Sequence, residues 1–492
     1  MDIIVQKKDE VYVKIDAEAH ITRELSDYFR FRVPGYQFMP SFRSKKWDGY
    51  IYLFSYLNYT LYYGLLDYLA TFAKDREYTI EYEFDYPKNN DVSLQDFKYF
   101  IDSVPTELIP RDYQLEAVHH AINKERSLLL SPTASGKSLI IYYLIRYYYP
   151  KKSLIVVPTI SLVYQMYSDF EEYANSEFNI EKNVHKIYGG QEKVSEKPIT
   201  ISTWQSIYNM SRRYFENFDV VVGDEAHLYK SKSLTGIMSK TTNAKYKIGT
   251  TGTLDGTQTH KLVLEGLFGP VFQVTTTKKL IDKKKLSPFS INCLILKYSD
   301  EICKQVNGMD YQEEIKFIVQ NKSRNNYIKN LVLGLNGNSL LLFQLVENHG
   351  KVLYDLIKQE VKDGRHIFFV FGGTDADTRE KVRSIVEKEQ DSIIVASYGV
   401  FSTGVNIRNL HNIIFASPSK SRIRNLQSIG RGLRLSSKKE KAILYDISDD
   451  LTWNGHRNYT INHFTERIKT VSYTHLRAHE TLRYLVCRLL LE

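Results

Sequence analysis

Cysteine is scarce in this sequence, and its scarcity excludes two classes of protein. The 492 residues include three cysteines, Cys293, Cys303 and Cys487, and no pair of them has C-x-x-C spacing. A disulfide framework and a cysteine-rich zinc module both need more cysteines at closer spacing. We therefore expect a protein of a reducing compartment, the cytoplasm, which would be that of the host cell if a phage encodes the chain.

Long apolar runs are missing too. No run approaches the roughly eighteen residues that cross a bilayer, and no apolar stretch follows the first basic residues as a secretory signal would require. Apolar residues still make up 43% of the chain, enough for a sizeable core. The length predicts about three domains. We expect a soluble monomer with no membrane partner.

The net charge of +9 and the pI near 9.0 favour a polyanionic partner, although many basic proteins bind none. Residues 1–100 are crowded with rings and cations and predict a small α+β domain. Within it, residues 29–36 and 42–50 interleave the two kinds of side chain, as surfaces that stack bases and bind phosphates do. The alternative is that the rings are core and the cations a solvated face. The candidate DNA-binding residues there are Arg30, Arg32, Arg43, Lys45, Lys46 and Trp47.

Apolar strand-like runs alternate with amphipathic helices after residue 100, which is typical of a parallel α/β sheet. The same succession of strands occurs twice, first from residue 154 to 224 and again from 340 to 416. We interpret it as two tandem RecA-like lobes, residues 101–282 and 283–471, rather than as coincidence among generic α/β elements. Residues 472–492 resemble a translated sequencing adapter, so we expect a non-native tail; the alternative is a basic C-terminal helix.

A phosphate-binding loop is predicted at residues 131–138, Ser-Pro-Thr-Ala-Ser-Gly-Lys-Ser, between an apolar strand and an apolar helix. Main-chain N–H groups at the start of that helix would face the phosphates. Lys137 would reach the β- and γ-phosphates, and the Ser138 hydroxyl would hold Mg²⁺. Ser131 replaces the usual first glycine, so a surface turn is the alternative for this motif taken alone.

Two acids follow the buried strand at residues 220–222, at the sheet edge where α/β proteins bind ligands. Asp224 would hold the metal ion, and Glu225 would orient the water that attacks the γ-phosphate. A solvated turn is the alternative, but it does not explain why the acids follow an apolar strand downstream of a phosphate loop.

Asp-Glu-Ala-His at residues 224–227, together with this loop, resembles superfamily-two helicases. Further motifs follow in that family's order at residues 111–114, 157–165, 202–205, 251–253, 402–406 and 427–434. The resemblance implies ATP and Mg²⁺ as cofactors. The residues it places at the nucleotide are Arg111, Gln114, Thr133, Ser135, Gly136 and Gly404. It also implies that His227, Thr251, Gly252 and Thr253 couple hydrolysis to lobe movement.

The second lobe supplies the other half of the predicted catalytic site. The resemblance implies that Gln427, Arg431 and Arg434 act on the γ-phosphate, the two arginines as fingers delivered across the cleft. Guanidinium groups placed there neutralise charge on the transferred phosphoryl group. Their spacing of three would put both arginines on one helix face, which does not exclude simple binding of DNA phosphates.

The same resemblance implies backbone contacts to DNA by Thr159, Thr203, Gln205 and Thr403, with little sequence specificity. The N-terminal region, with its interleaved rings and cations at residues 29–50, resembles that of branched-DNA helicases of T-even-type phages. That implies fork regression, branch migration and unwinding of D-loops and R-loops, on branched DNA, single-stranded DNA and RNA–DNA hybrids, with recombination proteins as partners. Three alternatives stay open: an RNA helicase, the motor subunit of a restriction system, and a DNA-binding or annealing protein switched by ATP.

Overall fold

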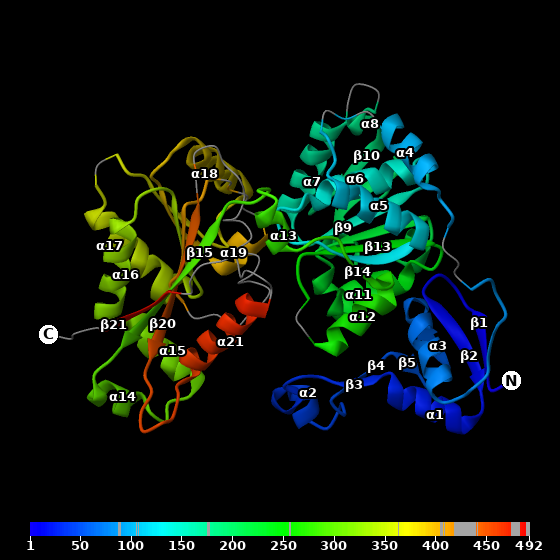
Figure 1. Ribbon diagram of the computed structural model, residues 1–492, viewed down its shortest axis with the longest axis horizontal. Helices are drawn as coiled ribbons and strands as arrows, with labels where there is room; N and C mark the ends of the chain where they lie inside the picture. The colour runs from blue at the N-terminus through cyan, green and yellow to red at the C-terminus, as the bar shows by residue number, and fades with distance from the viewer. Residues whose placement is uncertain are drawn as a thin grey trace. The chain divides into compact units, whose positions relative to one another are not determined.

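The computed structural model divides into two compact units, and each is described by itself. The first unit contains residues 1–131 and 136–274, and the second contains residues 132–135 and 275–492 (Figure 1). The residues that the structure describes are 1–86, 90–104, 106, 108–174, 178–254, 257–362, 364–403, 407, 409–417, 439, 441–473 and 483–488.

The N-terminal domain is a mixed sheet with two helices. Its strand order is β5-β6-β2-β1-β7, with β1 antiparallel to β2 and parallel to β7. Alternate residues of β1 point inward, so that Ile3 and Val5 are fully buried. The elements are β1 (Ile3–Lys7), β2 (Tyr12–Ala17), α1 (Ala19–Tyr28), β5 (Phe54–Ser55), β6 (Thr60–Tyr62), η2 (Tyr63–Leu65), α3 (Leu66–Asp75) and β7 (Ile80–Tyr82).

Residues 30–52 leave this sheet as a separate hairpin, which we call the cationic excursion. It carries five basic residues and one acidic residue, Asp48. Its two strands are antiparallel, with Arg30 opposite Tyr52 and Arg32 opposite Tyr50. The elements are β3 (Arg30–Arg32), η1 (Tyr36–Phe38), α2 (Pro40–Arg43) and β4 (Tyr50–Tyr52).

The rest of the first unit is lobe 1, whose described residues form a seven-stranded parallel sheet. The strand order is β10-β11-β9-β12-β13-β8-β14. Helices cover both faces, with α6 and α7 on one side and α11 and α12 on the other (Figure 1). The strands are β8 (Arg126–Leu130), β9 (Ser153–Val157), β10 (Val184–Ile187), β11 (Ile199–Thr203), β12 (Val220–Asp224), β13 (Tyr246–Thr251) and β14 (Val271–Gln273).

The helices of lobe 1 account for the apolar stretches between its strands. They are α4 (Leu94–Ser103), α5 (Asp112–Lys124), α6 (Lys137–Tyr148), α7 (Ile160–Tyr173), α8 (Ile180–Asn183), α9 (Trp204–Ile207), α10 (Arg212–Phe215), η3 (Ala226–Lys230), α11 (Lys232–Lys240) and α12 (Gln258–Phe268). Phe97 of α4 packs into the lobe-1 core, so this helix belongs to lobe 1 by its contacts although most of it lies within residues 1–100.

The second unit repeats the sheet of lobe 1 position by position. Its order is β17-β18-β16-β19-β20-β15-β21, which is the lobe-1 order with each strand number raised by seven. The two tandem parallel-sheet lobes predicted from the repeated pattern are therefore confirmed. The strands are β15 (Phe289–Lys297), β16 (Ser339–Phe343), β17 (Ile367–Val370), β18 (Ile393–Ser397), β19 (Asn412–Phe415), β20 (Ala442–Asp450) and β21 (Arg483–Arg488).

The helices of lobe 2 are α13 (Thr277–Asp282), α14 (Asp300–Val306), α15 (Tyr311–Gln320), α16 (Lys322–Gly334), η4 (Val346–Gly350), α17 (Lys351–Glu360), α18 (Ala376–Lys388), α19 (Tyr398–Thr403) and α21 (Tyr459–Tyr473). Strand β21 lies in the segment expected to be a non-native tail, and it pairs in parallel with β15. Among the described residues, no helix combines the length and the apolar character needed to cross a bilayer.

The N-terminal domain and lobe 1 share one hydrophobic cluster, which includes Phe72 of α3 and Phe268 of α12. Gly64 fits against the backbone of α12 so closely that a Cβ there would lie 2.1 Å from the Glu265 carbonyl oxygen. The Tyr68 hydroxyl donates a 2.8 Å hydrogen bond to the buried Glu265 carboxylate. The two parts of the unit are thus held by a continuous core rather than by a loose linker.

Buried charges reinforce the same contact. Arg126, the first residue of β8, pairs with Glu10 of the N-terminal domain at 2.7 Å and stacks on the Tyr63 ring at 4.4 Å. The Lys247 ammonium, at the start of β13, donates to the Glu10 main-chain oxygen at 2.9 Å. Burial lowers the pKa of both Arg126 and Lys247, and Glu10 opposes that effect in each. The strands that bear these cations also end at the predicted ATP site.

Candidate nucleotide site and nucleic-acid surface

The predicted phosphate loop connects β8 to α6, and its ends are fixed by main-chain geometry. Ser131 donates its N–H to the Thr251 oxygen at 2.8 Å, joining the loop to β13. Gly136 has φ +81, and a Cβ there would lie 2.3 Å from Gln114 Nε2. The positive φ favours glycine, and a side chain at this position would also displace the Gln114 amide. Within the loop, the Ser135 hydroxyl donates to the Pro132 oxygen at 2.7 Å, and Thr133 lies between them.

Arg111 and Gln114, two of the residues that the resemblance places at the nucleotide, lie against the end of this loop. Gln114 is buried, and its Nε2 donates to the Gly136 oxygen at 3.3 Å while its Oε1 accepts the Arg111 N–H at 2.8 Å. The Arg111 guanidinium donates to the Tyr113 hydroxyl at 2.8 Å. Arg111 and Gln114 are thus linked by hydrogen bonds to Gly136 of the phosphate loop.

Asp224 ends β12 and is almost completely buried. Thr250, on neighbouring β13, donates its hydroxyl to Asp224 Oδ1 at 2.7 Å. Burial, and then the charge of Glu225, raise the pKa of Asp224, whereas Lys137 and the Thr250 hydrogen bond lower it. A site that destabilises a lone carboxylate in this way is suited to a cation, since a cation restores the ionised form.

The residues fit magnesium by donor chemistry. Magnesium prefers hard oxygen ligands and is usually held by one or two carboxylates together with phosphates and water. Asp224 supplies a carboxylate, and Ser138, the second residue of α6, supplies a hydroxyl that lies 3.0 Å from the Tyr173 hydroxyl. Tyr173 could not be selected from the sequence, because it is one of many tyrosines and stands in no motif.

Glu225 adopts a left-handed backbone conformation, with φ +49 and ψ +50. Such geometry is unfavourable for a residue with a Cβ and is commonly found at functional sites. Its carboxylate lies 3.3 Å from Nδ1 of His227, which is itself 3.1 Å from the Thr251 hydroxyl. Thr251 in turn donates to the Thr253 oxygen at 3.0 Å across Gly252. The residues expected to couple hydrolysis to movement therefore form one bonded chain.

His260 belongs to the same network, although no motif in the sequence includes it. It is buried on α12, and its Nε2 lies 2.9 Å from the His227 main-chain oxygen. Seen in the sequence, it is one histidine among the apolar residues of a helix, which is usually a core position.

The residues expected to touch the DNA backbone in lobe 1 lie at or just beyond the carboxyl ends of β9 and β11. Thr159 caps α7 by accepting the Leu162 N–H at 3.3 Å. Gln205 is exposed and donates to the Pro158 oxygen at 3.3 Å. Thr203 is only 3% exposed, and its hydroxyl lies 2.8 Å from that of Ser206. Of these three, Gln205 is the most accessible to a strand.

Several predicted residues of lobe 2 lie outside the described part of the chain. Thr403 is the last residue of α19, but the structure does not describe its side chain. Gly404, Gln427, Arg431 and Arg434 fall outside the described residues altogether. Their assignment to the catalytic site stays a prediction.

The cationic excursion contains all the predicted N-terminal DNA contacts. Arg30 lies over the Tyr50 ring at 5.0 Å, and Arg32 lies 4.7 Å from the Tyr36 ring and 4.9 Å from that of Tyr50. Both arginines are exposed, so they remain accessible to phosphates. Phe29, just before the excursion, is fully buried, which confirms the core interpretation for that ring.

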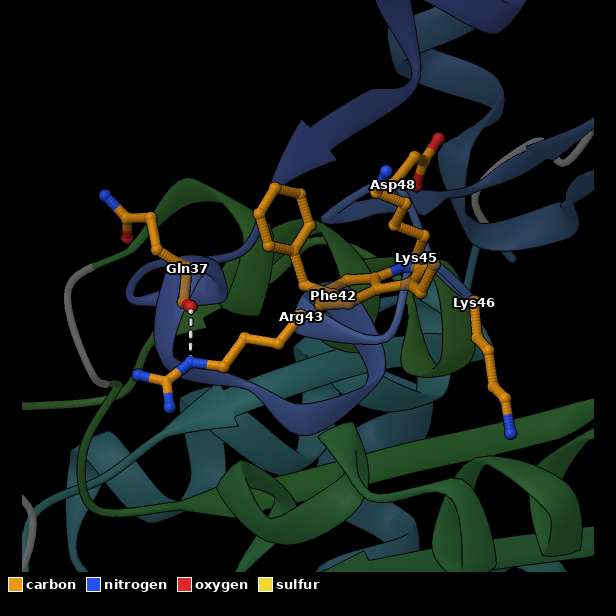
Figure 2. Close-up of a pocket in the computed structure, with 7 residues that line it drawn as sticks. Gln37, Phe42, Arg43, Lys45, Lys46 and Asp48 are labelled. Carbon is orange, nitrogen blue, oxygen red and sulfur yellow. Dashed lines mark hydrogen bonds between the residues drawn. The ribbon is translucent and has the colours of Figure 1, made fainter.

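The tip of the excursion carries a solvent-open hollow of about 600 Å³. Figure 2 shows the side chains that line it, with Arg43 reaching toward the Gln37 main-chain oxygen, to which it donates at 3.3 Å. The lining residues are Gln37, Phe42, Arg43, Lys45, Lys46, Trp47 and Asp48. Four of the predicted DNA-binding residues thus surround one cavity.

Three family models match successive parts of the chain. Residues 2–83 match "DNA helicase UvsW, N-terminal", residues 107–256 match "Type III restriction enzyme, res subunit", and residues 323–436 match "Helicase conserved C-terminal domain". The match to the restriction-enzyme model is confined to lobe 1.

Two curated relatives are similar over most of their length. The ATP-dependent DNA helicase uvsW of Enterobacteria phage T4 is 35% identical over 494 residues, covering 95% of this chain and 97% of the relative. The DNA 3'-5' translocase XPB2 of Sulfurisphaera tokodaii is 24% identical, covering 76% of this chain and 88% of the relative.

Solved structures agree with these matches. The crystal structure of T4 UvsW aligns over 100% of both chains with a TM-score of 0.52 and 32% identity. A DNA-bound type ISP restriction-modification enzyme, LlaBIII, aligns with 78% of this chain and 31% of its own, with a TM-score of 0.57 and 15% identity. At that identity the second likeness shows the fold alone.

Proposed function

The chain belongs to the UvsW family of ATP-dependent DNA helicases, and from this premise we propose that it uses ATP hydrolysis to remodel branched DNA. The proposed reactions are fork regression, branch migration of Holliday junctions, and unwinding of D-loops and R-loops, during phage recombination, replication and repair in the host cytoplasm. One observation carries the proposal: an N-terminal domain with an exposed group of cations and rings is built onto the lobe that holds the ATP site.

In the proposed hydrolysis step, Lys137 binds the β- and γ-phosphates at the start of α6. Ser138 and Asp224 hold Mg²⁺, which supplies positive charge to the phosphate oxygens when it is bound with ATP. Glu225 positions the attacking water, and its unusual backbone conformation directs its carboxylate toward His227. We therefore propose that loss of the γ-phosphate first changes the position of the Glu225 carboxylate.

The proposed coupling step follows the contacts that lead from that carboxylate through His227. His227 contacts Thr251 at the end of β13, and Thr251 also holds Ser131 through its main-chain oxygen. A change at Glu225 would thus alter both the phosphate loop and the segment after β13. Gln427, Arg431 and Arg434 are proposed to complete the site from lobe 2, so that hydrolysis requires closed lobes.

In the proposed DNA-binding step, contacts to sugars and phosphates hold a strand without reading bases. Gln205, Thr159 and Thr403 are the proposed contacts of the lobes, and Thr203 shapes the same edge from a buried position. The cationic excursion adds phosphate contacts that are independent of the lobes. Such a second point of attachment favours substrates with more than one arm.

The test is a panel of forks, four-way junctions, R-loops and plain duplexes, assayed for both ATPase stimulation and strand rearrangement. We expect branched substrates to be rearranged faster than plain duplexes of equal length. Arg431→Ala and Arg434→Ala should each lower ATP turnover by about 10³-fold, the smaller effect of losing an arginine finger, and leave ATP binding intact. Equal rates on all substrates would reject branch remodelling while leaving helicase activity standing.

A further inference from the structure

We propose that the hollow in the cationic excursion binds an unpaired nucleotide of single-stranded DNA, with its base against Trp47 and its phosphates near Arg43, Lys45 and Lys46. The proposal rests on the proposed function in one respect, that DNA reaches the excursion. Beyond the proposed function, it specifies which site on the protein binds DNA and which part of the DNA is bound, namely the unpaired nucleotide that a branch point exposes.

The size and lining of the hollow fit such a ligand. Its volume of about 600 Å³ falls in the range of small-ligand sites, roughly 300–1,000 Å³. Aromatic rings and cations line it together, and this combination holds bases by stacking and backbones by charge. A paired base has both faces covered by its neighbours in the duplex, so only an unpaired base offers a free face to a ring.

The rings of the hollow are held in place before any ligand arrives. The Trp47 indole N–H donates a 2.7 Å hydrogen bond to the Tyr50 main-chain oxygen, which anchors one edge of the ring. Phe42 meets Tyr36 edge to face, with ring centres 4.7 Å apart and planes at 87°. Because these side chains are already ordered, binding loses less conformational entropy than it would on a mobile surface.

The cations of the hollow are available to phosphates. Arg43, Lys45 and Lys46 are exposed, and none of the three forms an ion pair among the described residues. The acid of the lining, Asp48, accepts hydrogen bonds from the Tyr52 hydroxyl at 2.5 Å and from the Tyr50 N–H at 3.0 Å. Figure 2 shows the Lys46 side chain extending away from Asp48. The hollow therefore combines three cations that form no ion pair among the described residues with one carboxylate already bonded within its hairpin.

The chain has three tryptophans, so replacing the other two allows the fluorescence of Trp47 to report binding at the hollow. In the full chain carrying Trp204→Phe and Trp453→Phe, Trp47 is the sole source of tryptophan emission. We expect a short oligodeoxythymidylate to quench that emission in a saturable manner. An abasic strand of the same length and charge should bind more weakly and quench little. Equal quenching by both strands would show that the hollow binds phosphates alone and would overturn the proposal.

Variants provide a second readout that does not depend on fluorescence. Trp47→Ala should weaken single-strand affinity by about 5- to 150-fold, the range for one stacked base. Trp47→Phe retains a ring and should lose less. Tyr99→Ala removes a ring that is 64% exposed on α4, outside the excursion, and should change nothing. Unchanged affinity in a folded Trp47→Ala protein would also overturn the proposal.

The two proposals can fail separately. Should replacement of Arg43, Lys45 and Lys46 abolish branch preference while Trp47→Ala leaves it and strand affinity intact, the nucleotide site is wrong and the proposed function survives. Should none of these replacements affect binding or rearrangement of branched DNA, the excursion has no role in either, and only the nucleotide site is wrong. The proposed function falls instead if the unsubstituted protein rearranges branched DNA and plain duplexes at equal rates.

Discussion

His260 Nε2 lies 2.9 Å from the main-chain oxygen of His227, and this contact ties α12 to the turn that follows β12. The same helix carries Glu265, which accepts the hydrogen bond from Tyr68 of the N-terminal domain. One helix of three turns therefore contacts the DEAH segment near its start and the N-terminal domain near its end. Neither contact depends on the lobes being closed.

Replacing His260 should impair coupling more than ATP binding. Loss of a buried hydrogen bond costs about 1–3 kcal/mol, so His260→Ala should lower DNA-stimulated kcat by roughly 10-fold while KM for ATP changes little. His260→Gln can still donate to the His227 oxygen and should recover part of the loss. A purely structural role predicts instead a lower melting temperature, unchanged kcat in the folded fraction, and no selective rescue by glutamine.

Removing Arg126 should destabilise the N-terminal domain and lobe 1 together. Arg126→Ala leaves the partly buried Glu10 with Lys7 as its remaining ion-pair partner, so we expect a loss of about 3 kcal/mol, the lower end of the range for breaking a buried pair. We expect one lowered unfolding transition for this unit in calorimetry. Two separate transitions, with only the smaller one shifted, would contradict a shared core. The Arg126→Met and Glu10→Gln double variant should recover part of the loss.

The shared core of the N-terminal domain and lobe 1 could not be predicted from the sequence. Deleting residues 1–100 looks like a clean test from sequence alone, because the composition changes near that point. The structure shows that such a deletion would remove most of α4 and uncover the face of α12 against which Gly64 lies. Contacts between distant segments leave no periodic signal, so point substitutions on the excursion are the better experiment.

The strands of both lobes were predictable because parallel strands buried on both faces form continuous apolar runs. Val220, Val221 and Val222 are such a run: Val221 packs toward the N-terminal domain, and its two neighbours pack toward α6. The motif residues around Asp224 were predictable from spacing. The partners Thr250, Tyr173 and His260 were not, because each reaches the site from a different strand or helix.

Charge at the hollow should be measurable as salt dependence. Each phosphate contact contributes about 0.7 to the slope of log affinity against log salt for a single strand. Replacing Arg43, Lys45 and Lys46 by alanine should therefore reduce the slope by roughly 2. The matched control replaces Lys14, Arg23 and Lys74, exposed cations of the same domain outside the excursion. An equal fall in both proteins would indicate general charge attraction.

His349 predicts an acid-sensitive step in lobe 2. It is fully buried, with Nδ1 2.9 Å from the Ser417 hydroxyl, and burial followed by the charge of Arg324 lowers its pKa to about 3. Between about pH 3 and pH 6.5, His349 binds a proton in the unfolded protein, where its pKa is near 6.5, but stays neutral in the folded protein. Stability is therefore complete above about pH 6.5 and falls toward pH 3, by up to about 1.4 kcal/mol per pH unit.

Urea unfolding across this pH range checks the effect. His349→Gln removes the titrating group and should flatten the pH dependence relative to the unsubstituted protein. His456→Gln replaces an exposed histidine of the same lobe and should leave the dependence unchanged. Identical curves for all three proteins would show that other groups control acid sensitivity.

The most direct test of the account follows conversion of a four-way junction in the presence of ATP and Mg²⁺, comparing the unsubstituted protein with Lys137→Ala. We predict that Lys137→Ala binds the junction with similar affinity and does not convert it, because ATP is no longer held productively at the start of α6. Lys151→Ala, an exposed lysine of the same lobe, should convert it normally. Conversion by Lys137→Ala at the unsubstituted rate would contradict the claim that this site drives the rearrangement of DNA.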